Sequence, residues 1–195
     1  MGSCFISSDV LRGFIQTVLL EEGVEEFSAE AVAQGLLHAS LRGIDSHGIR
    51  LFPHYLRGLK GGRINHKPKF IFNKTSISTG KLDGDHSFGH AAGVEGMNKA
   101  IEMAADAGSG HVAVYNSSHF GAAAFFALIA AKRDMIGMCF TNATPHVLTS
   151  GGKRAFFGNN PICFVAPCEG EEPFCLDMAT SAITFNRVLQ HKESN

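Results

Sequence analysis

Hydrophobic positions in the first part of the chain recur with the period of an α-helix. Apolar residues return every three or four positions over 8–22, and Gly23 follows as a stop. A second helix is predicted from Ser28, as its N-cap, to about Leu41. Pro53 can begin a short third helix that the pair Gly61-Gly62 ends. The pattern therefore predicts a helical N-terminal segment.

The pattern then changes to short apolar runs that alternate with longer helical stretches. Helices are predicted at 91–107 and 120–132, and the polar run Asp83-Gly84-Asp85 is typical of a turn. Strands are predicted at 70–72, 76–82, 111–115, 135–141, 162–166 and 174–176. Such alternation is typical of a mixed α/β domain. We expect a helical segment over residues 1–65 and an α/β body over residues 66–195.

Composition and charge exclude several classes of protein. The chain has 17 Lys and Arg against 18 Asp and Glu, so no polybasic surface is available for nucleic acid. It is 45% hydrophobic, too much for a disordered chain, and no apolar run is long enough for a membrane helix. The five cysteines form no C-x-x-C pair, and Cys139 and Cys163 lie in apolar runs. Reduced core thiols of this kind predict a cytoplasmic protein.

The matches to common cofactor-binding and metal-binding motifs lie in an unsuitable structural context. Residues 108–113 match the glycine spacing of a dinucleotide loop, but they follow a predicted helix and open a strand, which reverses the required order. His86 and His90 are four residues apart, yet Phe88 and Gly89 between them favour a loop over a helix. A metal site there has no further support.

Two histidines lie in polar loops where acid–base chemistry is plausible. His47 follows Asp45 and Ser46 between two apolar helices, and His119 lies between a predicted strand and a predicted helix. Ligands in open α/β sheets bind at the carboxyl ends of strands, and histidine transfers protons near neutral pH. The alternative is that each histidine only bridges local backbone groups.

Two further polar clusters follow the same logic. The run 158–161, Gly-Asn-Asn-Pro, permits close approach of a ligand to the backbone, although a plain hairpin connection is the alternative. The run 177–181, Asp-Met-Ala-Thr-Ser, follows a predicted strand and offers small polar groups to a phosphate. The alternative there is a helix cap made by Thr180 or Ser181.

Taken together and in order, these motifs resemble those of the malate/L-lactate dehydrogenase family, NAD(P)-dependent oxidoreductases that lack a Rossmann fold. Its relatives include ureidoglycolate, sulfolactate and diketogulonate dehydrogenases. The motifs that carry the resemblance lie at 42–48, 82–85, 117–121, 141–143, 158–161 and 177–181. The resemblance implies a mixed-sheet α/β fold of that family's type, with the helical segment on the substrate and dimerisation side.

The resemblance also implies roles for single residues. His47 is similar to a histidine that donates a proton to the substrate carbonyl, and His119 to a second acid–base group. Ser46 and Thr144 would lie on the substrate side. Apart from the resemblance, we infer that Arg50, just after His47, could pair with a substrate carboxylate, because a guanidinium binds a carboxylate with two hydrogen bonds. The implied cofactor-binding residues are Asn142, Ala143, Asn160, Asp177, Met178, Ala179 and Thr180.

The implied activity is hydride transfer between NAD or NADP and a small 2-hydroxy or 2-oxo acid, in a protein that is a homodimer at full length. The choice of dinucleotide, the acid and the proton-donating histidine stay open. Two departures from the family's sequence pattern affect the expected activity. Asn159 stands where the family usually has Thr, and family members continue well beyond Asn195. The alternative is therefore a truncated, catalytically silent form that acts, if at all, through protein association.

Overall fold

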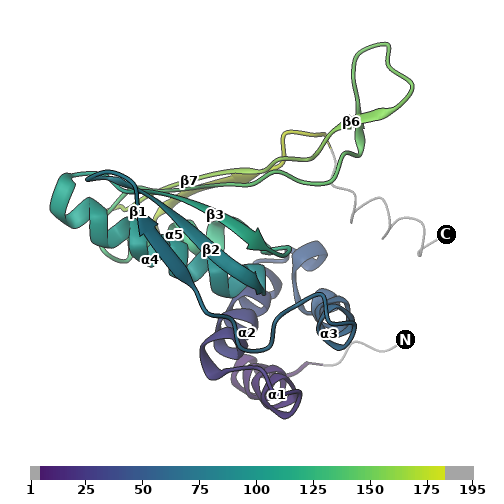
Figure 1. The fold of residues 1–195 in the computed structure, drawn as a ribbon. Helices are drawn as coiled ribbons and strands as arrows, with labels where there is room; N and C mark the ends of the chain where they lie inside the picture. The colour runs from purple at the N-terminus through teal and green to yellow at the C-terminus, as the bar shows by residue number, and fades with distance from the viewer. Residues whose placement is uncertain (1–4, 183–195) are drawn as a thin grey trace. The chain divides into compact units, whose positions relative to one another are not determined.

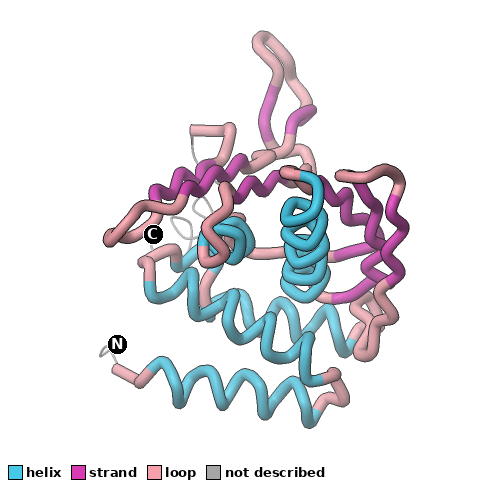
Figure 2. The backbone as a smooth tube through the Cα atoms, turned by 90° about the vertical axis from the view of Figure 1, so that its left-hand side faces the viewer, coloured by secondary structure: helices cyan, strands magenta, loops and turns pink. Residues whose placement is uncertain are grey.

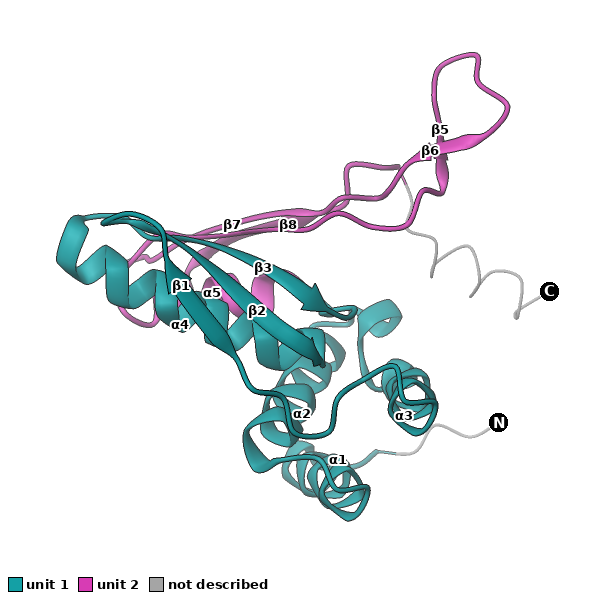
Figure 3. Cartoon of the chain, in the orientation of Figure 1, with its two compact units in different colours: residues 1–122 teal, residues 123–195 magenta. Residues whose placement is uncertain are grey.

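The computed structural model describes residues 5–182, which form parts of two compact units, residues 1–122 and 123–195 (Figure 3). This boundary differs from the one we expected at residue 65. The reason is that helix α2 (Glu26–Leu41) packs against helix α4 (Gly89–Ala107), which joins the helical segment and the first sheet into one unit. A functional division at residue 65 stays a prediction.

Unit 1 begins with three helices, as predicted: α1 (Ser8–Glu21), α2 and α3 (Phe52–Lys60). Helix α2 starts two residues before Ser28, so the predicted N-cap is wrong. Glu25 takes the N-cap position, and the Ser28 hydroxyl donates a hydrogen bond to its carboxylate at 2.9 Å. The wide apolar face of α2 explains its burial, since nine of its residues are buried.

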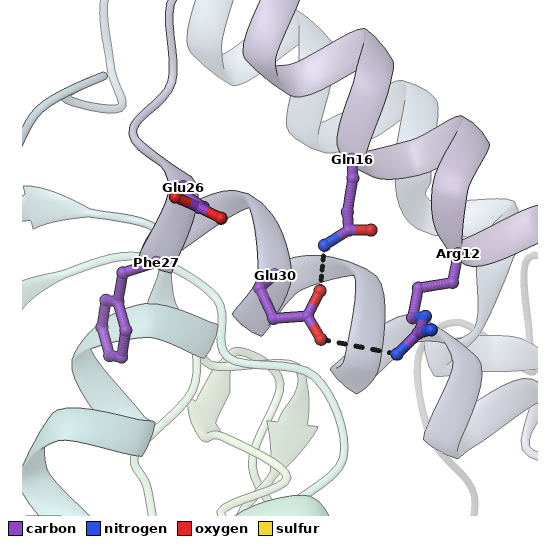
Figure 4. A pocket seen from close by; sticks show the side chains of 5 residues that line it. All are labelled: Arg12, Gln16, Glu26, Phe27 and Glu30. Atoms are coloured by element: carbon purple, nitrogen blue, oxygen red, sulfur yellow. Dashed lines mark hydrogen bonds and ion pairs between the residues drawn. The ribbon is translucent and has the colours of Figure 1, made fainter. Parts of the chain in front are cut away.

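Helices α1 and α2 lie side by side in antiparallel directions (Figure 2). Ile15 and Leu19 of the predicted apolar stripe are fully buried against α2. At the solvent edge, Glu30 receives a hydrogen bond from Gln16 and forms an ion pair with Arg12 at 3.8 Å (Figure 4). These side chains line a surface hollow that contains none of the predicted site residues.

The sheet of unit 1 has the order β1-β2-β3, with strands β1 (Ile71–Lys74), β2 (Thr79–Ser87) and β3 (His111–Ser117) (Figure 1). Strands β1 and β2 are antiparallel, and β2 and β3 are parallel with α4 as the connection between them. Helix α4 packs on β2 and β3.

The predicted turn at residues 83–85 is wrong, because strand β2 continues through it to Ser87. The pairing with β3 shifts between Asp83 and Ser87, and Asp85 and His86 take positive φ values of 46° and 57°. An irregularity of this kind lets a turn-like sequence stay in a strand when a neighbouring strand supplies hydrogen bonds. Pairing with β3 on either side of the irregularity therefore keeps these residues within the strand, although Asp85 and His86 keep a turn-like backbone.

Unit 2 combines helix α5 (Ala124–Ala131) with an antiparallel sheet, β4-β7-β8. Its strands are β4 (Gly137–Phe140), β7 (Ile162–Ala166) and β8 (Phe174–Met178), all at predicted places. A two-stranded ribbon, β5 (Val147–Leu148) and β6 (Ala155–Phe157), extends from it. The mixed α/β class that the sequence predicts is confirmed in both units.

Helix α5 covers one face of the β4-β7-β8 sheet. Cys163 and Val165 on that face are fully buried, and a Cβ on Gly137 would lie 2.2 Å from the carbonyl oxygen of Ala127, so the helix and β4 touch closely. Alternation along the strands places large apolar side chains on the other face. This apolar sheet face consists of Met138, Phe140, Ile162, Phe164, Phe174, Leu176 and Met178.

Six of these seven side chains are exposed, Phe140 to 58% and Phe174 to 56%. Contiguous exposed apolar side chains of this size are typical of a surface that binds another segment, another chain or a ligand.

Candidate active site

The two candidate histidines meet in unit 1. The rings of His47 and His119 stack, with ring centroids 5.6 Å apart and an angle of 20° between the planes. Both loops therefore present their histidines to one place, although the loops are far apart in sequence. The contact places the two rings close enough to act on one ligand, so a shared acid–base site stays a prediction that this geometry permits.

A short 3₁₀ turn, η1 (Asp45–His47), positions His47 after the end of α2. Gly48 packs against Ser40 of α2 so closely that a Cβ would lie 2.4 Å from the Ser40 hydroxyl oxygen. The same hydroxyl accepts a hydrogen bond from the backbone N–H of Ile49 at 3.0 Å. Ser46 Oγ and His47 Nδ1 are 2.9 Å apart, at hydrogen-bonding distance. Helix α2 therefore anchors the His47 loop.

The start of α4 positions His119. The backbone N–H of Gly89 donates to the Ser118 hydroxyl at 3.1 Å. A Cβ on Gly89 would lie 2.2 Å from the Ser118 carbonyl oxygen and 2.6 Å from that of His119. A glycine at residue 89 thus allows the His119 loop to lie directly on the helix.

Tyr55 of α3 completes this cluster, and sequence reasoning missed it. Its hydroxyl lies 2.7 Å from His119 Nδ1, and its ring is fully buried against Phe88 and His90, at centroid distances of 6.3 Å and 5.1 Å. Its position on the apolar face of a short helix was a signal of burial, but nothing in the sequence pointed to His119.

Burial and neighbouring positive charge favour the neutral forms of His119 and His90. Loss of solvent, and then the charges of His47, His54 and Arg63, lower the pKa of His119 to about 4. Burial, followed by the charges of His119 and His47, lowers the pKa of His90 to about 3. His119 keeps an exposed edge, so water offsets part of its lowering. At pH 7 we therefore expect His119 to carry one ring proton.

The predicted substrate residues are spread over both units. Ser46 is half-buried in η1 beside His47. Arg50 is exposed in the next 3₁₀ turn, η2 (Ile49–Leu51). Thr144 lies in unit 2, exposed in the loop between β4 and β5.

In unit 2 the structure brings three of the predicted cofactor segments together. Asn160 accepts a hydrogen bond from the backbone N–H of Ala143 at 3.0 Å. The Asn159 carbonyl accepts from the N–H and the hydroxyl of Thr180, at 2.8 Å and 2.9 Å. The Asn159 side-chain oxygen accepts from the Ser181 hydroxyl at 3.2 Å. Asn159, where the family pattern has Thr, therefore holds the segment that follows β8.

The remaining predicted cofactor residues differ in their surroundings. Asn142 and Met178 are exposed, and Ala179 is half-buried. The Asp177 carboxylate accepts a hydrogen bond from the backbone N–H of Ala124 at 2.7 Å, at the start of α5. Asp177 thus caps α5. The helix that Thr180 or Ser181 was considered to cap would follow residue 181 and falls on residues outside those that the structure describes.

Residues 6–195 match the family model described as malate/L-lactate dehydrogenase. The chain belongs to this family. It is 42% identical over 183 residues to malate dehydrogenase from Pyrococcus abyssi, covering 94% of this chain and 50% of that protein. It is 40% identical over 179 residues to L-sulfolactate dehydrogenase from Methanocaldococcus jannaschii, with coverages of 92% and 52%.

The solved structure of malate dehydrogenase from Entamoeba histolytica aligns with a TM-score of 0.95 at 37% identity, covering 99% of this chain and 54% of that chain. The resemblance to the malate/L-lactate dehydrogenase family and its fold is thereby confirmed. The chain spans about half the length of the curated relatives that it matches.

The unit 2 cluster fits the polar parts of the nicotinamide dinucleotide that dehydrogenases of this family use. Asn142 and Thr144 are exposed and carry an amide and a hydroxyl group, and Gly158 lets the loops meet, since a Cβ there would lie 2.2 Å from the Ala143 carbonyl oxygen. Among residues 5–182, no three metal-ligating side chains gather, and no helix could cross a membrane.

Proposed function

We propose that this chain acts, within a protein of the length of its relatives, as an NAD(P)-dependent oxidoreductase on a small 2-hydroxy or 2-oxo acid of the malate or lactate kind. The observation that carries the proposal is the stacked pair His47 and His119, because proton transfer to the substrate oxygen needs an acid–base group at a fixed place. Relatives named as malate and sulfolactate dehydrogenases support the class of substrate.

Unit 1 supplies the acid–base and substrate side chains in this proposal. His47 and His119 act on the substrate oxygen, and Ser46 holds His47 through its hydroxyl. Arg50, exposed in η2, binds the substrate carboxylate with its guanidinium. Thr144 of unit 2 contributes to the substrate side.

Unit 2 supplies the dinucleotide-binding side chains, with Asn160 and Thr180 at the centre of the hydrogen-bonded cluster and Asn142, Ala143, Asp177, Met178 and Ala179 around it. Bound NAD or NADP would supply the hydride. The protein's contribution is orientation, because holding both reactants removes much of the entropic barrier.

A second candidate is a catalytically silent form that acts through protein association. The exposed apolar sheet face favours it, because such a face can bind another chain. The same face supports our proposal that a longer protein is a homodimer, in which a second chain or a further segment covers it. A cytoplasmic location stays a prediction from the reduced thiols.

The test is an absorbance assay at 340 nm, with NADH or NADPH and a panel of 2-oxo acids, of the protein of its relatives' length that contains this chain. We expect turnover that falls by about 100-fold or more in His47→Ala, in line with the loss of general acid–base catalysis. His111→Ala, at the exposed start of β3, is the matched control. Full activity of His47→Ala would refute the mechanism. Turnover with neither dinucleotide, together with no NADH binding by fluorescence, would favour the silent form.

A further inference from the structure

We propose that Tyr55 is a positioning residue that holds His119 as the neutral tautomer with its proton on Nε2, so that His119 donates a hydrogen bond to the substrate oxygen while His47 exchanges the proton. The inference rests on the proposed function, since it divides the roles of the two histidines there.

The direction of the Tyr55–His119 hydrogen bond carries the argument. The Tyr55 side chain is fully buried, and its hydroxyl oxygen lies 2.7 Å from His119 Nδ1. Burial raises the pKa of Tyr55, so the hydroxyl keeps its proton at neutral pH. If the hydroxyl accepted a proton from Nδ1, its own proton would be buried without an acceptor, which costs free energy. The hydroxyl therefore donates and Nδ1 accepts.

The ring proton of neutral His119 is then on Nε2. A neutral histidine with one N–H can polarise a carbonyl by hydrogen bonding, but it is a poor proton donor because it would have to become an imidazolate. A second proton on Nδ1 is opposed by Tyr55 and by the titratable and charged groups around the ring. Those titratable and charged groups are His47 from η1, His54 from α3, Arg63 after α3 and His90 from α4.

The proton balance follows. In the reducing direction a bound reduced nicotinamide would supply a hydride to the carbonyl carbon. The carbonyl oxygen would take a proton carried by His47, which would be left as a neutral ring and be reprotonated from water. His119 begins and ends the step as a neutral ring with its proton on Nε2. Its hydrogen bond strengthens as negative charge develops on the oxygen.

The test reads the tautomer directly, from two-bond ¹H–¹⁵N NMR spectra of the ¹⁵N-labelled 195-residue protein, with His119→Gln assigning the signals. We expect the Nε2–H pattern for His119 from pH 8 down to pH 6. In Tyr55→Phe, which removes only the hydroxyl, we expect a mixture of tautomers and a titration midpoint raised by about 0.5 to 1 pH unit, the equivalent of one lost hydrogen bond. Tyr115→Phe, the exposed tyrosine of β3, should leave His119 unchanged.

An Nδ1–H pattern or a doubly protonated His119 ring at pH 7 in the unaltered protein would overturn the proposal. A Tyr55→Phe spectrum identical to that of the unaltered protein would also overturn it. The wild-type spectrum is decisive even if Tyr55→Phe does not fold. Because the NMR readout needs no turnover, failure of the role given to Tyr55 can be distinguished from failure of the proposed function. An Nε2–H ring without nicotinamide turnover contradicts the proposed function alone, and turnover with an Nδ1–H ring contradicts the role of Tyr55 alone.

Discussion

Gly89→Ala tests whether helix α4 positions the His119 loop. The added Cβ would lie 2.2 Å from the carbonyl oxygen of Ser118 and 2.6 Å from that of His119. Both are backbone atoms, so the loop or the helix has to move. Gly89 is helical and does not need a positive φ, so alanine itself is compatible with the backbone there. The expected cost is therefore that of the close contact alone.

The magnitude follows from two opposed effects. Overpacking of a tight contact costs about 1–3 kcal/mol. Replacing glycine by alanine in a helix returns up to about 1 kcal/mol. We expect a net loss of about 1–2 kcal/mol, which with a urea dependence of about 1–3 kcal/mol per molar lowers the unfolding midpoint by about 1 M.

Gly13→Ala is the matched control. Gly13 lies in α1 of the same unit, is exposed, and has nothing within 4 Å of an added Cβ. That variant should gain about 0.5–1 kcal/mol. Urea unfolding followed by far-UV circular dichroism compares the two. Equal stabilisation by both alanines, with unchanged His119 NMR signals, would refute the anchoring of the loop.

Three further predictions follow from charge and burial. Stability should fall as the pH is lowered from about 6.5 towards 4, because His119 and His90 have lowered pKa values and bind protons more readily when unfolded. The measurement is the fall in melting temperature between pH 7 and pH 5, which should be smaller in His90→Gln than in the unaltered protein. An equal fall in both would contradict this reasoning. Asp177→Asn should destabilise unit 2 by about 0.5–2 kcal/mol, because it weakens the charged cap of α5; an unchanged urea midpoint would contradict this. A thiol reagent at pH 8 should modify exposed Cys168 before Cys163, whose pKa burial raises, and mass spectrometry of the early product showing Cys163 labelled first would reverse that order.

Where hydrophobic period was strong, the sequence predicted the elements closely. Helix α1 begins at Ser8 as expected, and strand β7 has the predicted bounds Ile162–Ala166. Prediction failed where polar residues had to be assigned without knowledge of their neighbours. Residues 83–85 have turn chemistry yet lie in β2, because β3 pairs with Asp83 before the register shift and with Ser87 after it. Ser28 bonds to the N-cap residue instead of being it.

The candidate site divides in the same way. His47 and His119 could be selected from local motif and loop position, whereas Tyr55 could not, because its sequence neighbours show only a buried position in a short helix. Asn159 was noted as a departure in sequence, but its hydrogen bonds to the Thr180 segment depend on the pairing of β7 with β8.

The sequence by itself determined the helical and α/β segments, the family, and the two histidines, since periodicity and motif order are properties of the chain. Only the tertiary structure decided that the two rings stack, that a buried tyrosine hydroxyl faces Nδ1 of one of them, and that one face of the second sheet is left apolar and exposed. The physical reason is that periodicity reports which face of an element is buried, while the partner of that face depends on long-range packing.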